Sequence, residues 1–140
     1  MTKERLKKYQ AIKAECKQLK TLLEEIESRL YDPKAQQLTG MPHAPGSTGS
    51  GSAQERMADK TMALRDHYKA KIAELEAEQL RIEEAIDSFD DPKTRQLFRC
   101  KYIEGMTWEE VCVTIGYAWR QTHRRHSEAL QLLKEREPEE

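Results

Sequence analysis

A heptad repeat near the start of the chain constrains the fold more strongly than any other feature of the sequence. Apolar residues recur there at alternating steps of three and four, while Lys, Glu, Gln and Arg fill most of the other positions. The repeat consists of Tyr9, Ile12, Cys16, Leu19, Leu23, Ile26 and Leu30. Within the N-terminal segment 1–31 it predicts one long helix over residues 2–31. Because so narrow an apolar stripe does not stabilise an isolated helix in water, this helix needs a partner helix.

The same chain supplies a second long helical pattern, predicted over residues 54–91. Its apolar edge consists of Leu64, Tyr68, Ile72, Leu75, Ile82, Ile86 and Phe89. Residues 32–53 hold seven of the eleven Gly and Pro residues and are predicted to form a flexible linker. Residues 1–20 carry seven Lys or Arg against two Asp or Glu, whereas residues 54–91 carry six against eleven. These opposite charge balances favour a long antiparallel, coiled-coil-like hairpin.

Asp91 and Pro92 mark a change from long to short helices. Aspartate is a favoured N-cap residue, and proline fits the first position of a helix. We therefore expect a helix over residues 92–104, which Gly105 closes. This helix is the first element of a small C-terminal domain predicted over residues 92–136.

Two further helices complete the predicted C-terminal domain. The first begins after Thr107, whose spacing to Glu110 is that of a capping box, and it ends at Gly116 in a left-handed conformation. The second runs over about residues 119–135, and the acidic tail 137–140 follows it. The predicted fold class is therefore all-α, with the hairpin followed by this small domain.

Composition and motifs argue against several classes of protein. Hydrophobic residues make up 37% and aromatic residues 6% of the chain, which disfavours an all-β sandwich or a doubly wound α/β fold. No apolar run approaches the roughly 18 residues of a membrane-spanning helix, and the charged start of the chain lacks a signal sequence. No nucleophile, base and orienting group occur at useful spacing, and there is no Gly-rich phosphate loop. We expect a cytosolic protein that is not an enzyme and carries no cofactor.

The three cysteines, Cys16, Cys100 and Cys112, are expected to be reduced thiols that pack as small apolar residues. A minor alternative is redox sensing by an exposed Cys16. A metal site would combine Cys100, Cys112, His123 and His126, but it lacks the closely spaced Cys pair of structural zinc sites. We therefore expect no metal.

Positive charge is concentrated in the C-terminal domain. Residues 93–126 carry seven Lys or Arg against three Asp or Glu, in a chain whose formal net charge is −1. The helix from Thr107 to Gly116, a short connection and a basic helix together have the pattern of a helix-turn-helix. These features favour binding to DNA phosphates, although a protein-docking module has the same pattern.

The start of this helix-turn-helix resembles the region-four domain of bacterial sigma factors. The motif of that family is Tyr, one residue, Glu-Gly, one residue, Thr, one residue, Glu-Glu and an aliphatic residue. The matching residues are Tyr102, Glu104, Gly105, Thr107, Glu109, Glu110 and Val111, with Ile115, Gly116 and Tyr117 at the end. The resemblance covers about residues 92–133. It implies that Tyr102, Gly105, Thr107, Glu110, Val111, Ile115 and Gly116 build a helix-turn-helix that reads promoter DNA.

The whole chain resembles the ArpU/RinA-type regulators of phages and prophages. The resemblance rests on two long helices, the Gly40-Met41-Pro42 linker between them, and the helix-turn-helix at the end. It implies a sequence-specific regulator of transcription on double-stranded DNA, an activator of late genes in the cytoplasm of a bacterial host, with RNA polymerase as a further partner. Two alternatives stay open: a small terminase-like DNA-packaging subunit, and a helical adaptor that docks proteins without touching DNA.

Helix geometry divides the last helix into two faces. At about 100° per residue, Thr122, His126, Ala129 and Leu133 cluster on the side that faces the rest of the domain. The base-reading candidates lie opposite or beside that side: Arg120, Gln121 and Arg124. The phosphate-contact candidates are Arg99, Lys101, His123 and Arg125. Trp108 and Trp119 are expected in the core.

A homodimer is the expected assembly. Helix-turn-helix proteins commonly bind paired half-sites as dimers. The apolar surface that the hairpin leaves for this contact is expected to include Leu22, Leu75 and Leu80.

Overall fold

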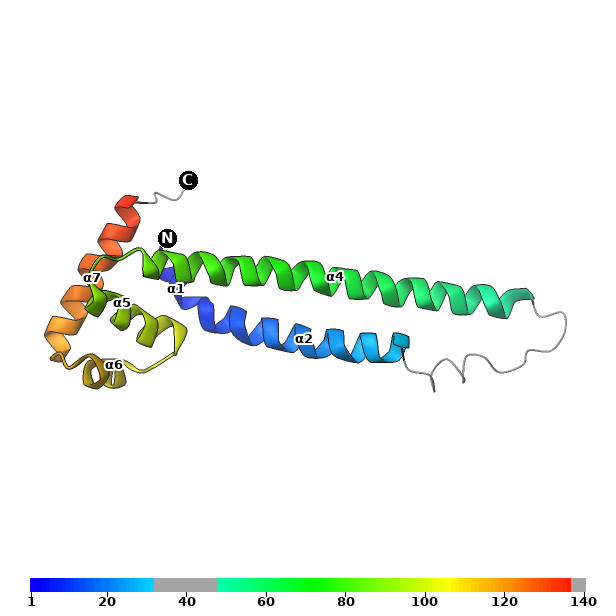
Figure 1. The fold of residues 1–140 in the computed structure, drawn as a ribbon, viewed down its shortest axis with the longest axis horizontal. Helices are drawn as coiled ribbons and strands as arrows, with labels where there is room; N and C mark the ends of the chain where they lie inside the picture. Colours follow the sequence, from blue (N-terminus) through cyan, green and yellow to red (C-terminus); the bar gives the residue numbers. More distant parts are fainter. Residues whose placement is uncertain (32–47, 137–140) are drawn as a thin grey trace. The chain divides into compact units, whose positions relative to one another are not determined.

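The structure, a computed structural model, describes residues 1–31 and 48–136, and within these ranges all regular secondary structure is helical (Figure 1). The larger part of the predicted linker, residues 32–47, and the acidic tail 137–140 lie outside the described residues. The chain divides into two compact units. One combines Met1–Ala14 with the chain from Leu75 onward, and the other spans Glu15–Glu74.

The N-terminal helix is broken, which corrects the prediction of one helix over residues 2–31. Helix α1 covers Lys3–Lys7 and helix α2 covers Tyr9–Tyr31. At Lys8 the backbone N–H donates to the carbonyl of Arg5, at 3.1 Å, in the tighter pattern of a 3₁₀ turn. Thr2 caps α1, because its hydroxyl oxygen accepts the N–H of Arg5 at 3.4 Å.

Helix α4 has different boundaries from the predicted second helix. It covers 40 residues, Thr48–Asp87, so it starts inside the predicted linker and ends four residues before Asp91. The backbone N–H of Ser88 bonds to the carbonyls of Glu84 and Ala85, and the chain leaves the helix there.

The unit Glu15–Glu74 contains parts of α2 and α4 that contact each other. The Lys69 ammonium lies 3.5 Å from the Glu27 carboxylate, and the Arg65 guanidinium donates to the Tyr31 hydroxyl at 3.3 Å. At these contacts the two helices therefore run antiparallel. Ile72 in this unit is buried.

One alternative and one expectation for the two long helices are wrong. Cys16 is only 4% exposed, so the exposed cysteine that redox sensing requires is absent. Leu75 is buried as well and does not belong to the apolar surface proposed for dimerisation, whereas Leu80 is 54% exposed. Leu64, on the predicted apolar edge of the second helix, is 43% exposed.

The helix predicted over 92–104 consists of two kinds of helix. Helix α5 covers Pro92–Phe98, and the π-helix η1 covers Arg99–Ile103. In η1 the N–H of Glu104 reaches back five residues to the carbonyl of Arg99, at 2.9 Å. At the end of η1, the carbonyls of Tyr102 and Ile103 accept hydrogen bonds from the Gln10 side chain. A residue of α2 therefore satisfies the last carbonyls of η1.

One buried apolar cluster joins the N-terminal residues, the end of α4 and all the later helices. Phe98 lies at its centre, with ring centroids 4.8 Å from Phe89 and 5.6 Å from Tyr102. The cluster consists of Met1, Leu6, Tyr9, Ile82, Ala85, Ile86, Phe89, Leu97, Phe98, Cys100, Tyr102, Val111, Ile115, Ala129 and Leu133. The C-terminal domain is therefore not confined to residues 92–136, because residues 1–9 fill part of its core.

Helix α6 covers Trp108–Ile115 and helix α7 covers Trp119–Arg136, joined by a three-residue turn. As predicted, Thr107 caps α6, with its hydroxyl oxygen 3.3 Å from the N–H of Glu110, and Gly116 ends it in the left-handed region at φ +75°. Lys93 supports the same end from α5, because its ammonium donates to the Ile115 carbonyl at 3.1 Å.

Substitution of Gly116 tests this turn. A Cβ at this position meets no atom within 4 Å, so Gly116→Ala is expected to act through backbone strain alone. A left-handed alanine costs about 1–2 kcal/mol. We expect urea denaturation to show a loss of this size, and a smaller loss for Gly116→Asn, since asparagine tolerates this conformation better. An unchanged midpoint for Gly116→Ala would contradict the left-handed end of α6.

Candidate nucleic-acid interface

The inner face of α7 is formed by the four residues that the sequence places there. Thr122, His126, Ala129 and Leu133 are all buried. The Thr122 hydroxyl donates to the carbonyl of Ala118 at 2.9 Å, which satisfies a buried polar group within the helix itself. Burial of these four residues fixes the rotation of α7 about its own axis, and so determines which residues face outward.

A buried aromatic pair holds α7 against η1. The Tyr102 hydroxyl and the His126 Nε2 are 2.5 Å apart, and the His126 ring also stacks on Phe98 at a centroid distance of 5.2 Å. Burial raises the pKa of Tyr102 to about 12, with a further contribution from the negative charge of Glu4. Burial, followed by nearby positive charges, lowers the pKa of His126 to about 4. Both groups are neutral near pH 7, so the pair is a hydrogen bond and not an ion pair.

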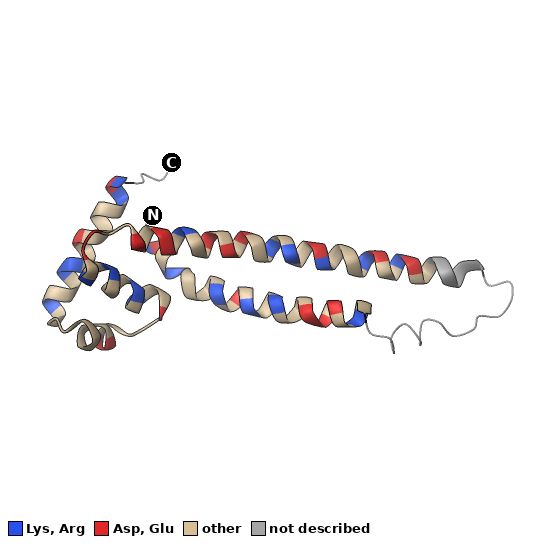
Figure 2. Cartoon of the chain, in the orientation of Figure 1, with Lys and Arg blue, Asp and Glu red and all other residues tan. Residues whose placement is uncertain are grey.

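The outer face of α7 carries the residues that the sequence suggests for base reading. Arg120, Gln121 and Arg124 are all exposed. The Arg124 side chain is 71% exposed, and its nearest carboxylate, that of Glu128, lies 4.0 Å away. Figure 2 shows positive residues in the N-terminal half of α7, where these side chains begin. The three side chains therefore extend donors and an acceptor into solvent from one end of a rigidly packed helix.

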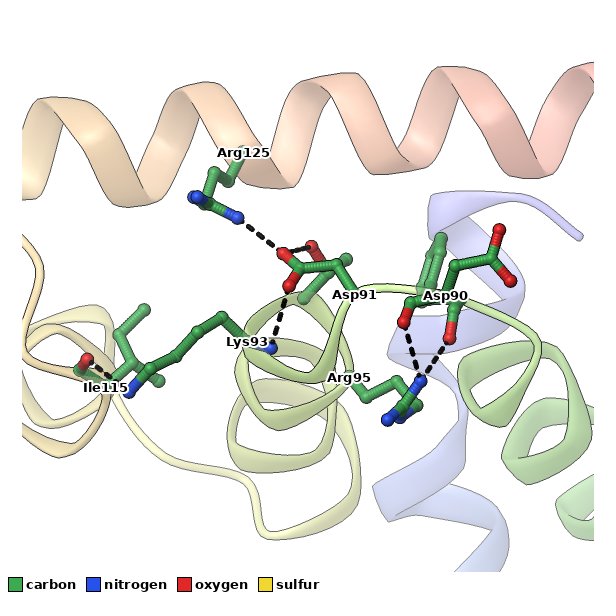
Figure 3. A network of polar contacts seen from close by, with 8 residues as sticks. Asp90, Asp91, Lys93, Arg95, Ile115 and Arg125 are labelled. Carbon is green, nitrogen blue, oxygen red and sulfur yellow. Dashed lines mark hydrogen bonds and ion pairs between the residues drawn. The ribbon is translucent and has the colours of Figure 1, made fainter.

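Arg125, a predicted phosphate contact, is in a different position, because it has an ion-pair partner within the protein. Its guanidinium donates to the Asp91 carboxylate at 2.5 Å (Figure 3). It also lies over the Tyr117 ring, 4.9 Å from the ring centroid. Asp91 also accepts the N–H of Lys93 and the hydroxyl of Thr94. The pKa of Asp91 is lowered, most of all by the hydrogen bond from Thr94. Lys93 and Arg125 lower it further, whereas burial has the opposite effect.

This network links three elements of the unit. Asp91 is the N-cap of α5, Arg125 belongs to α7, and Tyr117 lies in the turn before α7. Nearby, Arg95 donates to the carbonyls of Phe89 and Asp90 and holds the chain that enters α5. Arg125 therefore fixes the position of α7 relative to α5, a role for which the sequence pattern gives no signal.

Two other phosphate candidates have partners of their own. Arg99 forms an ion pair with Asp87, in which both side chains remain about half exposed. The Lys101 ammonium lies 4.9 Å above the Trp108 ring and donates to the Met106 carbonyl at 3.4 Å. Lys101 is partly buried, so its charge lies close to the protein surface and not at the end of an extended side chain.

The fourth candidate, His123, lies between two tryptophans. Its ring centroid is 4.3 Å from that of Trp108 and 4.4 Å from that of Trp119. Its Nε2 is buried and has no hydrogen-bond partner, so this atom does not face a phosphate. His123 packs between the rings, and its expected role as a phosphate contact stays a prediction.

Trp119 is not in the core, contrary to expectation, whereas Trp108 is partly buried and packs against the core. Trp119 is 52% exposed at the first position of α7, beside Arg120. Its exposed surface adds an apolar group to the candidate interface, one that the sequence pattern was not expected to place there. The helix pattern contains one signal for this: at about 100° per residue, Trp119 falls at the edge of the inner face and not at its middle.

The low pKa of His126 makes stability depend on pH. In the unfolded chain this histidine takes up a proton below about pH 6.5, whereas in the folded protein it does so only near pH 4. The unfolded state therefore binds more protons between these values, and the free energy of unfolding falls as the pH is lowered through them.

His126→Gln tests this dependence, because glutamine does not titrate and keeps a polar group near Tyr102. We expect the melting temperature of the parent to fall more than that of the variant between about pH 7.5 and about pH 5. An equal fall in both proteins would show that the burial of His126 does not produce the pH dependence.

The chain belongs to a protein family described as a protein of unknown function, DUF1492, which matches residues 47–134. The match covers α4 to α6 and α7 as far as residue 134, including Arg120, Gln121 and Arg124, and leaves out α1 and α2. No curated protein matches the chain, and no solved structure matches it. Over the described residues, none of the helices combines the length and the apolar character that a membrane crossing requires.

Proposed function

We propose that this protein is a sequence-specific regulator of transcription that binds double-stranded DNA through the outer face of α7. One observation carries the proposal. Arg120, Gln121 and Arg124 are exposed together near the start of a helix whose opposite face is buried. Recognition helices of helix-turn-helix proteins present their N-terminal residues to base edges in the major groove.

The chemistry of these side chains suits base edges. Arginine donates two hydrogen bonds to the O6 and N7 atoms of guanine, and glutamine pairs in the same way with N6 and N7 of adenine. A helix fixed in rotation by buried contacts presents such groups in a constant orientation, which sequence-specific reading requires. The indole of Trp119 supplies an apolar surface beside them, suited to a thymine methyl group.

The resemblances found in the sequence add the finer parts of the proposal. The α6–turn–α7 segment acts as a helix-turn-helix similar to sigma region four, and the long helices form an antiparallel hairpin that supports a homodimer. By its resemblance to ArpU/RinA-type regulators, the protein activates late genes of a phage or prophage in the bacterial cytoplasm and contacts RNA polymerase.

Selection from a pool of random DNA duplexes tests the proposal. The full chain is expected to enrich one short motif, and a pool of random single strands serves as the control. Sedimentation of the protein with the enriched duplex is expected to show a dimer. A ring-sized assembly would favour a small terminase-like packaging subunit. Absence of any enrichment at low salt, with capture of polymerase or another protein, would favour a docking adaptor.

A further inference from the structure

Helix α1 is built into the same core as the proposed DNA-reading helix. Met1 and Leu6 are 2% and 0% exposed, in one cluster with Phe98 of α5 and Leu133 of α7. Just beyond α1, Tyr9 donates to the Glu83 carboxylate at 2.5 Å. The orientation of α1 on this unit is therefore fixed by packing on its buried side.

The exposed surface of α1 carries a pair of lysines. Lys3 and Lys7 are both exposed and lie four residues apart, so they share one side of the helix. We call them the α1 lysine pair. Thr2 caps the helix in front of them, which keeps the first turn ordered.

The α1 lysine pair lies near a third lysine, from another element. Apart from burial, the groups that lower the pKa of His126 are Lys3 and Lys7 from α1, Lys101 from η1 and His123 from α7. The charges of three lysines thus act on the same buried ring. Glu4 of α1 also acts here, because its negative charge contributes to the raised pKa of Tyr102.

We propose that the α1 lysine pair binds backbone phosphates of the same DNA duplex that α7 reads, so that α1 is a second DNA-contacting element. This inference rests on the proposed function. It is carried by the packing of α1 against the core that contains α7. It is also carried by the hydrogen bonds from Gln10, three residues beyond Lys7, to the carbonyls of Tyr102 and Ile103, which follow Lys101 in η1. A lysine ammonium is a compact point charge suited to phosphate, and it carries no sequence preference.

The two DNA contacts therefore differ in what they contribute. The side chains of α7 distinguish bases, whereas the lysines add affinity on every sequence by releasing counterions from the DNA. Each neutralised phosphate contributes about 0.9 to the slope of log affinity against log salt. Loss of two such contacts is expected to lower the slope by about two units, whatever the sequence.

The test compares Lys3→Ala/Lys7→Ala with a matched control, Lys13→Ala/Lys17→Ala. The control removes two exposed lysines with the same spacing from α2, outside the cluster around His126. Both variants and the parent are titrated with a selected duplex and a scrambled duplex at several salt concentrations. Melting temperatures verify folding, and Lys3→Arg/Lys7→Arg restores the charge.

We expect Lys3→Ala/Lys7→Ala to weaken binding by the same factor on both duplexes and to lower the salt slope by about two units. The Arg variant and the Lys13/Lys17 control are expected to match the parent. If the parent binds and the α1 variant keeps its affinity and slope, the inference is wrong while the proposed function stands. An equal loss in the control would also overturn it, as a general effect of charge. If the parent binds neither duplex at low salt, both proposals fail.

Discussion

Leu6→Ala is expected to destabilise the protein by about 2–5 kcal/mol, the range for truncating a fully buried leucine. Leu6 is 0% exposed and packs in the cluster that holds α5, α6 and α7 together. The loss therefore reports whether α1 belongs to the C-terminal unit. Urea denaturation, followed by the helical signal in circular dichroism, measures it.

The matched control is Leu132→Ala, which removes the same atoms from a side chain that is 46% exposed. Its effect is expected to stay within about 0.5 kcal/mol, as is usual for surface positions. If both leucine variants unfold at the urea concentration of the parent, α1 does not pack into the unit.

Arg124→Ala is expected to lose about 1–3 kcal/mol of binding free energy on the selected duplex and to relax the preference at one base pair. The reason is that Arg124 is exposed on the outer face of α7 and has only a distant carboxylate, at 4.0 Å, to compete with a base. Titration of a fluorescent duplex, with each base pair of the motif varied in turn, measures both effects.

Arg81→Ala is the control for charge, since it removes an exposed arginine from α4 that pairs with Glu78. It is expected to bind as the parent does. The outcome that contradicts the assignment of Arg124 is an equal loss on selected and scrambled duplexes, because such a loss indicates a phosphate contact.

Much of the C-terminal domain was predictable from local signals. The capping threonine, the left-handed glycine and the inner face of α7 each depend on a few neighbouring residues, and the structure has all three where the sequence places them. Such signals act within one or two turns of helix, so they do not depend on how the rest of the chain folds.

The break between α1 and α2 could not be predicted in this way. No Gly or Pro lies near Lys8, and the heptad repeat continues from Tyr9 without a shift. The break allows Met1 and Leu6 to reach a core made mostly of residues beyond position 80. It is therefore set by tertiary packing, which a local pattern does not contain.

The candidate interface was predictable in part for a similar reason. Helical periodicity gives the direction in which a side chain leaves α7, and Arg120, Gln121 and Arg124 are exposed as it predicts. It does not show which groups a long side chain contacts. Arg125 bonds to Asp91, 34 residues away in sequence, and the Lys101 ammonium lies over the Trp108 ring. Whether an arginine or lysine is available to DNA therefore depends on distant partners.

The proposed function requires that the outer face of α7 gives this protein a sequence preference on DNA. The most direct test is the ratio of dissociation constants for scrambled and selected duplexes at one near-physiological salt concentration. If α7 reads bases, we expect a preference of about a thousandfold or more, the lower end for specific DNA-binding proteins. Equal affinity for the two duplexes would contradict it.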